Sequence, residues 1–261
     1  KKKKKGGNVY IGYEAGEGVR GNSNSRNVGI GFNALEGITT GIDDTAIGNK
    51  AGHILTSGAR NTFLGSFSSE NLTTGNDNVI LGWKAGATNV SGDEMVLIGS
   101  AAGFSLNHDT DNDGAVFIGY NAGYNYVAGG GGGVFIGFKA GQMADDSTVN
   151  AIYNTYIGYE GGRFLDDGTH NVALGHQAMR STDSNARNAS NSVAIGYQSL
   201  YQITDGDSNI SLGSNSGFAL TTGSENILIG RNTGKGITTS GNNTYVGHAV
   251  ASNSSSTGHS N

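Results

Sequence analysis

A short apolar pattern recurs along the whole chain and ends each time in glycine. Its first copy is Asn8–Gly12, and most of the fourteen copies lie 17 residues apart. A fixed period of this size is typical of a solenoid, in which each repeat buries its apolar side against the next. The repeat glycines are Gly12, Gly31, Gly48, Gly65, Gly82, Gly99, Gly119, Gly137, Gly158, Gly175, Gly196, Gly213, Gly230 and Gly247.

The residues before each repeat glycine alternate as they do in a β-strand. The flanking columns, which stand one and three residues before the glycine, hold aliphatic residues or Thr, such as Val9 and Ile11. Side chains along a strand point alternately to its two faces, so the flanking columns share one face. A strand of about four residues is too short to be stable alone and must stack on its neighbours. We therefore expect an all-β chain, folded as a parallel β-solenoid (β-roll) of about fourteen coils.

Other columns support stacking of thin coils. Asn stands four residues before many repeat glycines, as at Asn61 and Asn78, and predicts a ladder of amide hydrogen bonds from coil to coil. A small residue, such as Ala51 or Ala85, stands three residues after the glycine. These small side chains predict a far wall that closely approaches the flanking columns. We expect the flanking columns to form the core.

The middle column, two residues before the repeat glycine, is also largely apolar. Because it points away from the flanking columns, a thin coil can cover only one of the two apolar faces. An uncovered stripe of this length exceeds what soluble monomers usually expose. We therefore expect other copies of the chain to bury the middle column. The oligomer interface predicted in this way comprises Tyr10, Phe63, Ile80, Leu97, Phe117, Phe135, Tyr156, Leu228 and Tyr245.

Composition limits the partners and the architecture. The repeat defines one domain, residues 8–251, between an N-terminal tail (1–7) and a C-terminal tail or linker (252–261). The chain has no Pro, which suits central strands that need every N–H, and no Cys, which excludes disulfides and thiolate metal sites. Its formal net charge is −5, with few basic residues beyond Lys1–Lys5, which argues against nucleic acid as a partner. No stretch predicts a membrane span or a signal peptide.

Two segments resemble repeats of known fibrous proteins. Asn191–Gly196, with the sequence NSVAIG, resembles the repeat of YadA-like trimeric autotransporter adhesin heads. Thr221–Gly230 resembles the related repeats of bacteriophage tail fibres. The resemblance implies a left-handed β-roll assembled as a parallel homotrimer, located outside the cell, on its surface or in a virion. The repeat here is longer than that of the adhesins and no coiled-coil stalk is present, so phage fibre, adhesin head and secreted filament stay open.

One segment suggests a metal. Asp109–Gly114, with the sequence DTDNDG, matches the first half of a calcium-binding loop. Its carboxylates, on Asp109, Asp111 and Asp113, stand at alternate positions and can converge on one cation. The twelfth position is Tyr120 in place of a bidentate acid, so a polar turn insertion is the competing interpretation. Calcium is the only cofactor that the sequence suggests.

The longer intervals between repeat glycines are candidates for recognition. Their extra residues fall in turns, where a solenoid tolerates insertions. A target could be distinguished there by Asn107–Gly114, Ala128–Gly133, Met143–Tyr153 and Ser181–Ser190.

The column after the repeat glycine, the aromatic column, offers a competing function. It could pack between chains or form a track on which sugars stack. Ice binding fits less well, because adjacent Thr residues face different ways, and a depolymerase would need paired carboxylates. We expect a non-enzymatic fibre or filament segment that attaches to a cell-surface glycan or protein receptor, with a carbohydrate-binding module as the alternative. The aromatic column contains Tyr13, Phe32, Trp83, Tyr120, Phe138, Tyr159 and Tyr197.

Overall fold

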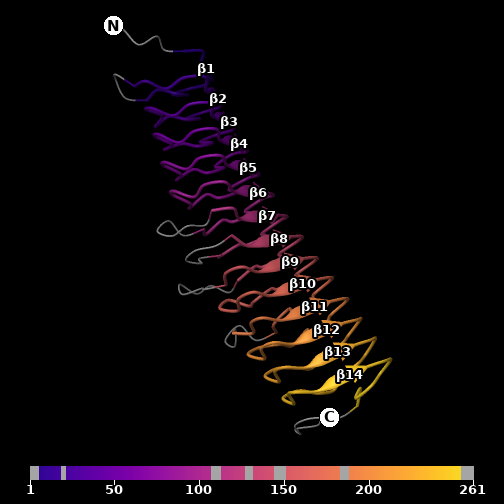
Figure 1. Cartoon of the computed structure of the whole chain (residues 1–261). Coiled ribbons are helices and arrows are strands. Elements are labelled where there is room, and N and C mark those ends of the chain that lie inside the picture. The colour runs from indigo at the N-terminus through magenta and orange to yellow at the C-terminus, as the bar shows by residue number, and fades with distance from the viewer. Residues whose placement is uncertain are drawn as a thin grey trace. The chain divides into compact units, whose positions relative to one another are not determined.

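The computed structural model describes residues 6–18, 22–106, 113–126, 132–143, 151–182 and 188–253. These residues form fourteen β-strands of three residues each, paired in parallel within two compact units (Figure 1). Unit 1 is Lys1–Gly132 and unit 2 is Gly133–Asn261. The predicted all-β parallel solenoid with a spacing of about 17 residues is confirmed.

In unit 1, each strand pairs with the next one along the chain. The register aligns equivalent positions of successive repeats, so that Thr62 lies opposite Val79. Isolated parallel bridges from Gly6 to Asn76 extend this pairing beyond the strands. The strands are β1 (Val9–Ile11), β2 (Val28–Ile30), β3 (Thr45–Ile47), β4 (Thr62–Leu64), β5 (Val79–Leu81), β6 (Val96–Ile98) and β7 (Val116–Ile118).

Unit 2 repeats this arrangement. Val172, for example, lies between Thr155 of the preceding strand and Val193 of the following one. The strands are β8 (Val134–Ile136), β9 (Thr155–Ile157), β10 (Val172–Leu174), β11 (Val193–Ile195), β12 (Ile210–Leu212), β13 (Ile227–Ile229) and β14 (Thr244–Val246).

The predicted Asn ladder is present in both units and is buried. In unit 1, Asn78 Nδ2 donates to Asn61 Oδ1 at 2.9 Å and to Gly92 O, in the returning turn, at 2.9 Å. In unit 2, Asn226 Nδ2 donates to Asn209 Oδ1 at 3.0 Å. Each amide therefore ties one coil to its neighbour and the strand to the turn, and satisfies polar groups that would be costly to bury alone.

The repeat glycines are required by the close approach of successive coils. Gly65, directly after β4, has a φ of +136°, which L-residues rarely adopt. A Cβ on Gly65 would lie 2.6 Å from the carbonyl oxygen of Gly82 in the next coil. A side chain here would therefore strain the backbone and push the coils apart.

The middle column lines the inside of the coil, so the predicted oligomer interface is wrong. Phe63, Ile80, Leu97, Phe117, Phe135, Tyr156 and Leu228 are fully buried within the single chain, and Tyr10 and Tyr245 are partly buried. The flanking columns, expected in the core, point outwards instead. Alternation along a strand separates two faces but does not say which of them is inside.

The far wall fits the middle column residue by residue. The counter column, four residues after each repeat glycine, holds Gly52, where a Cβ would lie 2.7 Å from the ring of Phe63. Where the middle column is small, at Gly29 and Ala46, the counter column holds Leu35. Leu35 is fully buried although its φ is +53°. Burying a leucine, worth about 2 kcal/mol, outweighs a left-handed backbone that costs about 1 kcal/mol.

The orientation of the middle column can be tested with a double-mutant cycle. Gly52→Ala places a methyl group against the ring of Phe63, and Phe63→Ala should relieve that clash. We expect a coupling of about 1–3 kcal/mol in the free energy of unfolding, measured by urea denaturation. The control pairs Gly52→Ala with Leu64→Ala, whose side chain points outwards, and should be additive within about 0.5 kcal/mol. Additivity in both pairs would place Phe63 outside the coil.

Candidate functional site

The flanking columns form an apolar sheet face on the outside of each unit. Each three-residue strand turns its central side chain inwards, so the other two point outwards. The exposed fraction is 58% for Ile11 and 46% for Leu64 in unit 1, and 44% for Leu174 in unit 2. Every residue of the flanking columns is Val, Ile, Leu or Thr. The sheet face therefore lacks the charges that normally keep an exposed sheet in water.

The apolar sheet face is large enough for an interface between proteins. Seven strands about 4.8 Å apart, each about 10 Å long, give one unit a face of roughly 300 Å² in projection. A typical monomer exposes at most about 300–600 Å² in its largest apolar patch. The faces of both units together approach the area of about 800 Å² that each partner buries in a standard interface.

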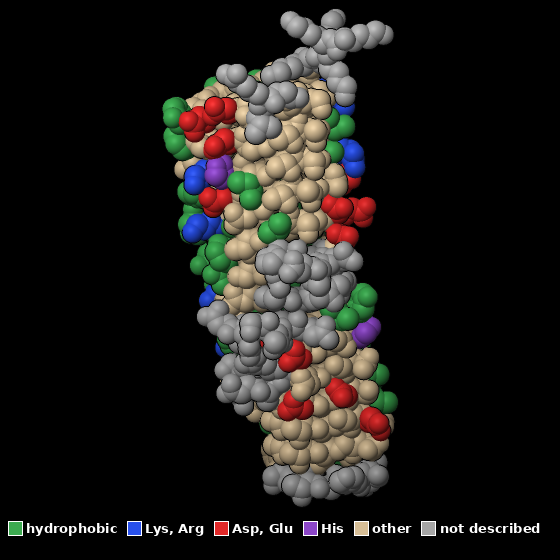
Figure 2. Space-filling model, turned by 90° about the vertical axis from the view of Figure 1, so that its left-hand side faces the viewer, with side chains coloured by type: hydrophobic (Ala, Val, Ile, Leu, Met, Phe, Trp, Pro, Cys, Tyr) green, Lys and Arg blue, Asp and Glu red, His purple; other side chains and the backbone are tan. Residues whose placement is uncertain are grey.

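The side that carries the returning turns has a different character. Over the described residues, Figure 2 shows mainly uncharged polar side chains and backbone there, with few hydrophobic side chains. In these turns the hydroxyl groups of Thr39 and Thr56 each donate to a carbonyl of the next coil at 2.9 Å. These hydroxyls therefore contribute to the stack itself, and the apolar surface is concentrated on the strands.

The aromatic column forms ladders of stacked rings just beyond the repeat glycines. In unit 2, the ring centroids of Phe138, Tyr159, His176 and Tyr197 follow one another at 5.0, 4.9 and 5.3 Å. Successive ring planes differ by at most 21°, so Tyr159 and His176 have both ring faces covered by neighbours. A sugar stacks on an aromatic side chain through the ring face. The ladder exposes mainly ring edges, which favours packing over a sugar track.

Unit 2 also contains a charge cluster between coils. Glu160 is 7% exposed, and its carboxylate lies 2.6 Å from Arg163 Nη1 and 3.0 Å from Arg180 Nε. Gln177 Nε2 donates to the same carboxylate at 2.9 Å. Burial opposes ionisation of Glu160, but Gln177 and the two guanidinium groups outweigh it and hold the pKa of the carboxyl below its usual value. The cluster is thus a cross-link between coils.

The sequence analysis missed this cluster. Arg163 and Arg180 are separated by one repeat of 17 residues, as are Glu160 and Gln177. Residues one repeat apart lie side by side in the stack. A search for complementary side chains at this spacing would have found the cluster.

Charges elsewhere in unit 1 are paired one to one. The exposed ion pairs Arg26–Asp43 and Arg60–Asp77 join neighbouring coils at 2.6 and 2.5 Å. In each pair the hydrogen bonds from the arginine hold the pKa of the aspartate below its ordinary value. In the part of the chain that the structure describes, no three His, Cys, Asp or Glu side chains gather where they could hold a metal ion.

The predicted calcium loop is described only at its end. Asp109 and Asp111 lie outside the described residues. The carboxylate of Asp113 accepts a hydrogen bond from Asp93 N at 2.8 Å. Asp93 accepts one in the same way from Asn76 N, so Asp113 continues a row of side chains that support the stack. Calcium binding by this loop stays a prediction.

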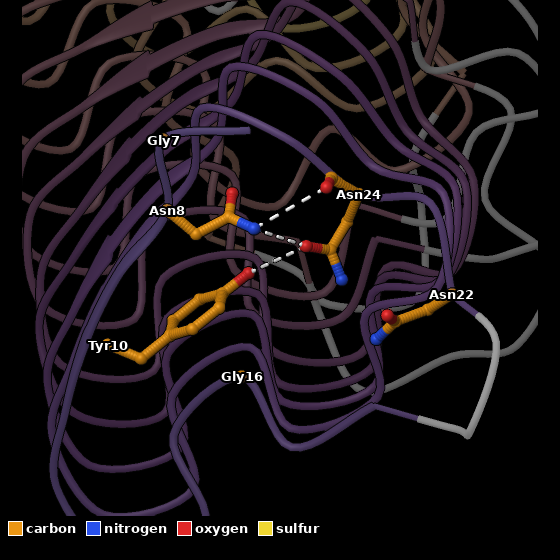
Figure 3. A pocket seen from close by; sticks show the side chains of 6 residues that line it. All are labelled: Gly7, Asn8, Tyr10, Gly16, Asn22 and Asn24. Atoms are coloured by element: carbon orange, nitrogen blue, oxygen red, sulfur yellow. Dashed lines mark hydrogen bonds between the residues drawn. The ribbon is translucent and has the colours of Figure 1, made fainter. Parts of the chain in front are cut away.

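A polar pocket of about 300 Å³ lies beside β1 in unit 1 (Figure 3). Asn24 Oδ1 accepts hydrogen bonds from Asn8 Nδ2 at 2.6 Å and from the Tyr10 hydroxyl at 3.3 Å. Burial raises the pKa of Tyr10, so its hydroxyl stays neutral. The pocket offers amides and a phenol for hydrogen bonding. It is lined by Gly7, Asn8, Tyr10, Gly16, Asn22 and Asn24.

Comparison of the chain with protein-family models, curated proteins and solved structures finds no match. The described residues contain no helix with the length and hydropathy needed to cross a membrane. The apolar sheet face is therefore the feature from which a function can be inferred.

Glu160→Gln should lower the free energy of unfolding by about 3 kcal/mol, because it leaves two largely buried guanidinium groups without their carboxylate. The matched control is Glu225→Gln, an exposed carboxylate that also has a positive φ, and it should change stability by at most about 0.5 kcal/mol. Urea denaturation at pH 7 measures both variants. Because the folded pKa of Glu160 is lowered, its contribution is present above the unfolded pKa and is lost as the pH falls through the folded pKa. Equal stability of the two variants would contradict this role.

Proposed function

We propose that the chain is a non-enzymatic segment of an extracellular fibre or filament that serves attachment or receptor binding. In this proposal, copies of the chain associate in parallel as a homotrimer. The observation that carries it is the apolar sheet face, formed by uncharged flanking columns along both units. Water contact with such a surface is unfavourable by about 25 cal/mol per Å² of apolar area, so a covering partner is expected.

A second copy of the chain is the partner that fits this face best. The face is flat and regular, with the same residue types at each coil, so an identical face in parallel orientation matches it rung by rung. The interface in this proposal consists of the flanking columns, in place of the middle column. Three copies are the number that the resemblance to adhesin heads and phage fibres implies.

The charge pattern supports a structural role over a catalytic one. The carboxylates of Asp43, Asp77 and Glu160 are each held by arginines of the chain itself. A depolymerase would need two carboxylates facing a sugar in a groove. What these acids stabilise is the contact between neighbouring coils.

Self-association can be tested on the outward side of the strands. Leu64→Asp combined with Leu174→Asp should convert the assembly to folded monomers, because each charge would be buried without a partner at the interface. The matched control, Thr74→Asp with Thr222→Asp, places the same charges on exposed turn residues and should leave the assembly intact. Light scattering counts the copies, and circular dichroism shows whether the chain stays folded. A wild-type monomer at micromolar concentration would refute the trimer.

Attachment can be tested on the longer loops. Deleting Asn107–Gly114 or Ser181–Ser190 should reduce binding to target cells or to a glycan array while the strand content stays unchanged, since solenoid turns tolerate such changes. Unaltered binding would make this segment a passive shaft. Hydrolysis of a polysaccharide by the purified chain would contradict the non-enzymatic role.

A further inference from the structure

One rung of the buried Asn ladder in unit 1 is an aspartate. Asp44 is fully buried and stands between Asn27 and Asn61 in the ladder. Its backbone N–H donates to Asn27 Oδ1 at 2.8 Å. Its Oδ1 accepts from Asn61 N at 3.0 Å and from Asn61 Nδ2 at 2.9 Å, as an asparagine Oδ1 does at other rungs. Half of the side chain therefore reproduces the amide ladder.

The other oxygen, Oδ2, stands where the other rungs have an N–H donor. At neighbouring rungs the side-chain nitrogen donates to a carbonyl 14 residues further on: Asn27 to Gly41 O at 2.9 Å and Asn61 to Gly75 O at 2.8 Å. The equivalent carbonyl for Asp44 is that of Gly58. Asp44 Oδ2 is buried and has no hydrogen-bond partner.

The surroundings of two glycines show the same substitution. A Cβ built on Gly58 would meet both Asn61 Nδ2 and Gly75 O, which are hydrogen-bonded to one another. A Cβ built on Gly41 would lie 2.8 Å from Asp44 Oδ2 and 2.8 Å from Gly58 O. Two acceptors thus occupy the place of a donor and an acceptor. An ionised Asp44 would leave both buried without a proton between them, which is costly.

We infer that Asp44 is carried in its protonated form, with Oδ2–H donating to Gly58 O, so that unit 1 has an acid-stabilised rung. Protonation completes the ladder and removes a buried charge, whereas ionisation at neutral pH breaks that hydrogen bond. The element acts as a pH-sensitive device within the stack. This inference is independent of the proposed function.

The charges around Asp44 agree with this assignment. Burial raises the pKa of Asp44 to about 6, although the hydrogen bonds from Asn61 act in the opposite direction. Asp43 on the same coil raises it further, and Arg60 on the next coil lowers it. Asp43 is already paired with Arg26 of the preceding coil. The phenol of Tyr10, the remaining titratable group close enough to interact, is neutral in this range.

The direction of the pH effect follows from the raised pKa. A pKa of about 6 in place of 3.8 means that the folded chain binds this proton roughly 100-fold more tightly than the unfolded chain. The resulting stability is fully present below the unfolded pKa and is lost as the pH rises through the folded pKa. Asp43, Asp77 and Glu160 act with the opposite sign, so the comparison of variants isolates Asp44.

Asp44→Asn tests the inference, since an amide supplies the missing donor at every pH. The unfolding constant of the wild type should rise roughly 100-fold relative to that of Asp44→Asn between pH 4 and pH 7. The Tm of Asp44→Asn at pH 7 should exceed that of the wild type by roughly 5–10 °C. Both are measured by circular dichroism at equal protein concentration. An identical pH dependence for the two chains would overturn the inference.

The converse variant is Asn226→Asp in unit 2, where the rung lies between Asn209 and Asn243 as Asp44 lies between two asparagines. It should lower the Tm at pH 7 and recover most of the loss at pH 4. A loss that is equal at both pH values would show that a carboxyl group cannot replace the amide even when protonated, and would also overturn the inference.

Discussion

The fold depends on the close approach of successive coils at the repeat glycines. No strand exceeds three residues, so none of them could persist without hydrogen bonds to the coils on either side. That pairing brings the backbone of one coil so close to the next that a Cβ on Gly65 would overlap the carbonyl of Gly82. The invariant glycine and the near-constant spacing follow from this single requirement, because every coil must lie flat on its neighbour.

The same constraint determines what fills the coil. With one inward side chain per strand, the interior is narrow, and a large residue on one wall requires a small one on the other. Phe63 is accommodated by Gly52, and Tyr156 by Gly162. Where the strand offers only a small side chain, a leucine or methionine on the far wall fills the space despite its left-handed backbone, as at Leu35 and Met179. Packing therefore decides which of these left-handed positions can dispense with glycine.

A three-residue strand also leaves more apolar surface outside than inside. Two of its three side chains face water, and in this chain those two are aliphatic or Thr at every coil. Self-association through the flanking columns would remove that surface from water and would join the coils of neighbouring copies rung by rung. The proposed fibre and the thin interior thus have one origin in the strand length. The buried Asp44 is a local exception to an otherwise neutral ladder, and its cost depends on pH.

The sequence alone determined the period, the strand positions, the repeat glycines and the Asn ladder, because each is a local requirement repeated at every coil. Only the tertiary structure decided which strand face is inside. Alternation assigns the middle and flanking columns to opposite faces, and both are apolar, so hydrophobicity could not choose between them. The deciding information lies in size complementarity between distant positions, such as Phe63 with Gly52, which becomes visible only when the far wall is in place. The Glu160 cluster likewise required coils one repeat apart to be stacked, since its charges are ordinary until they lie side by side.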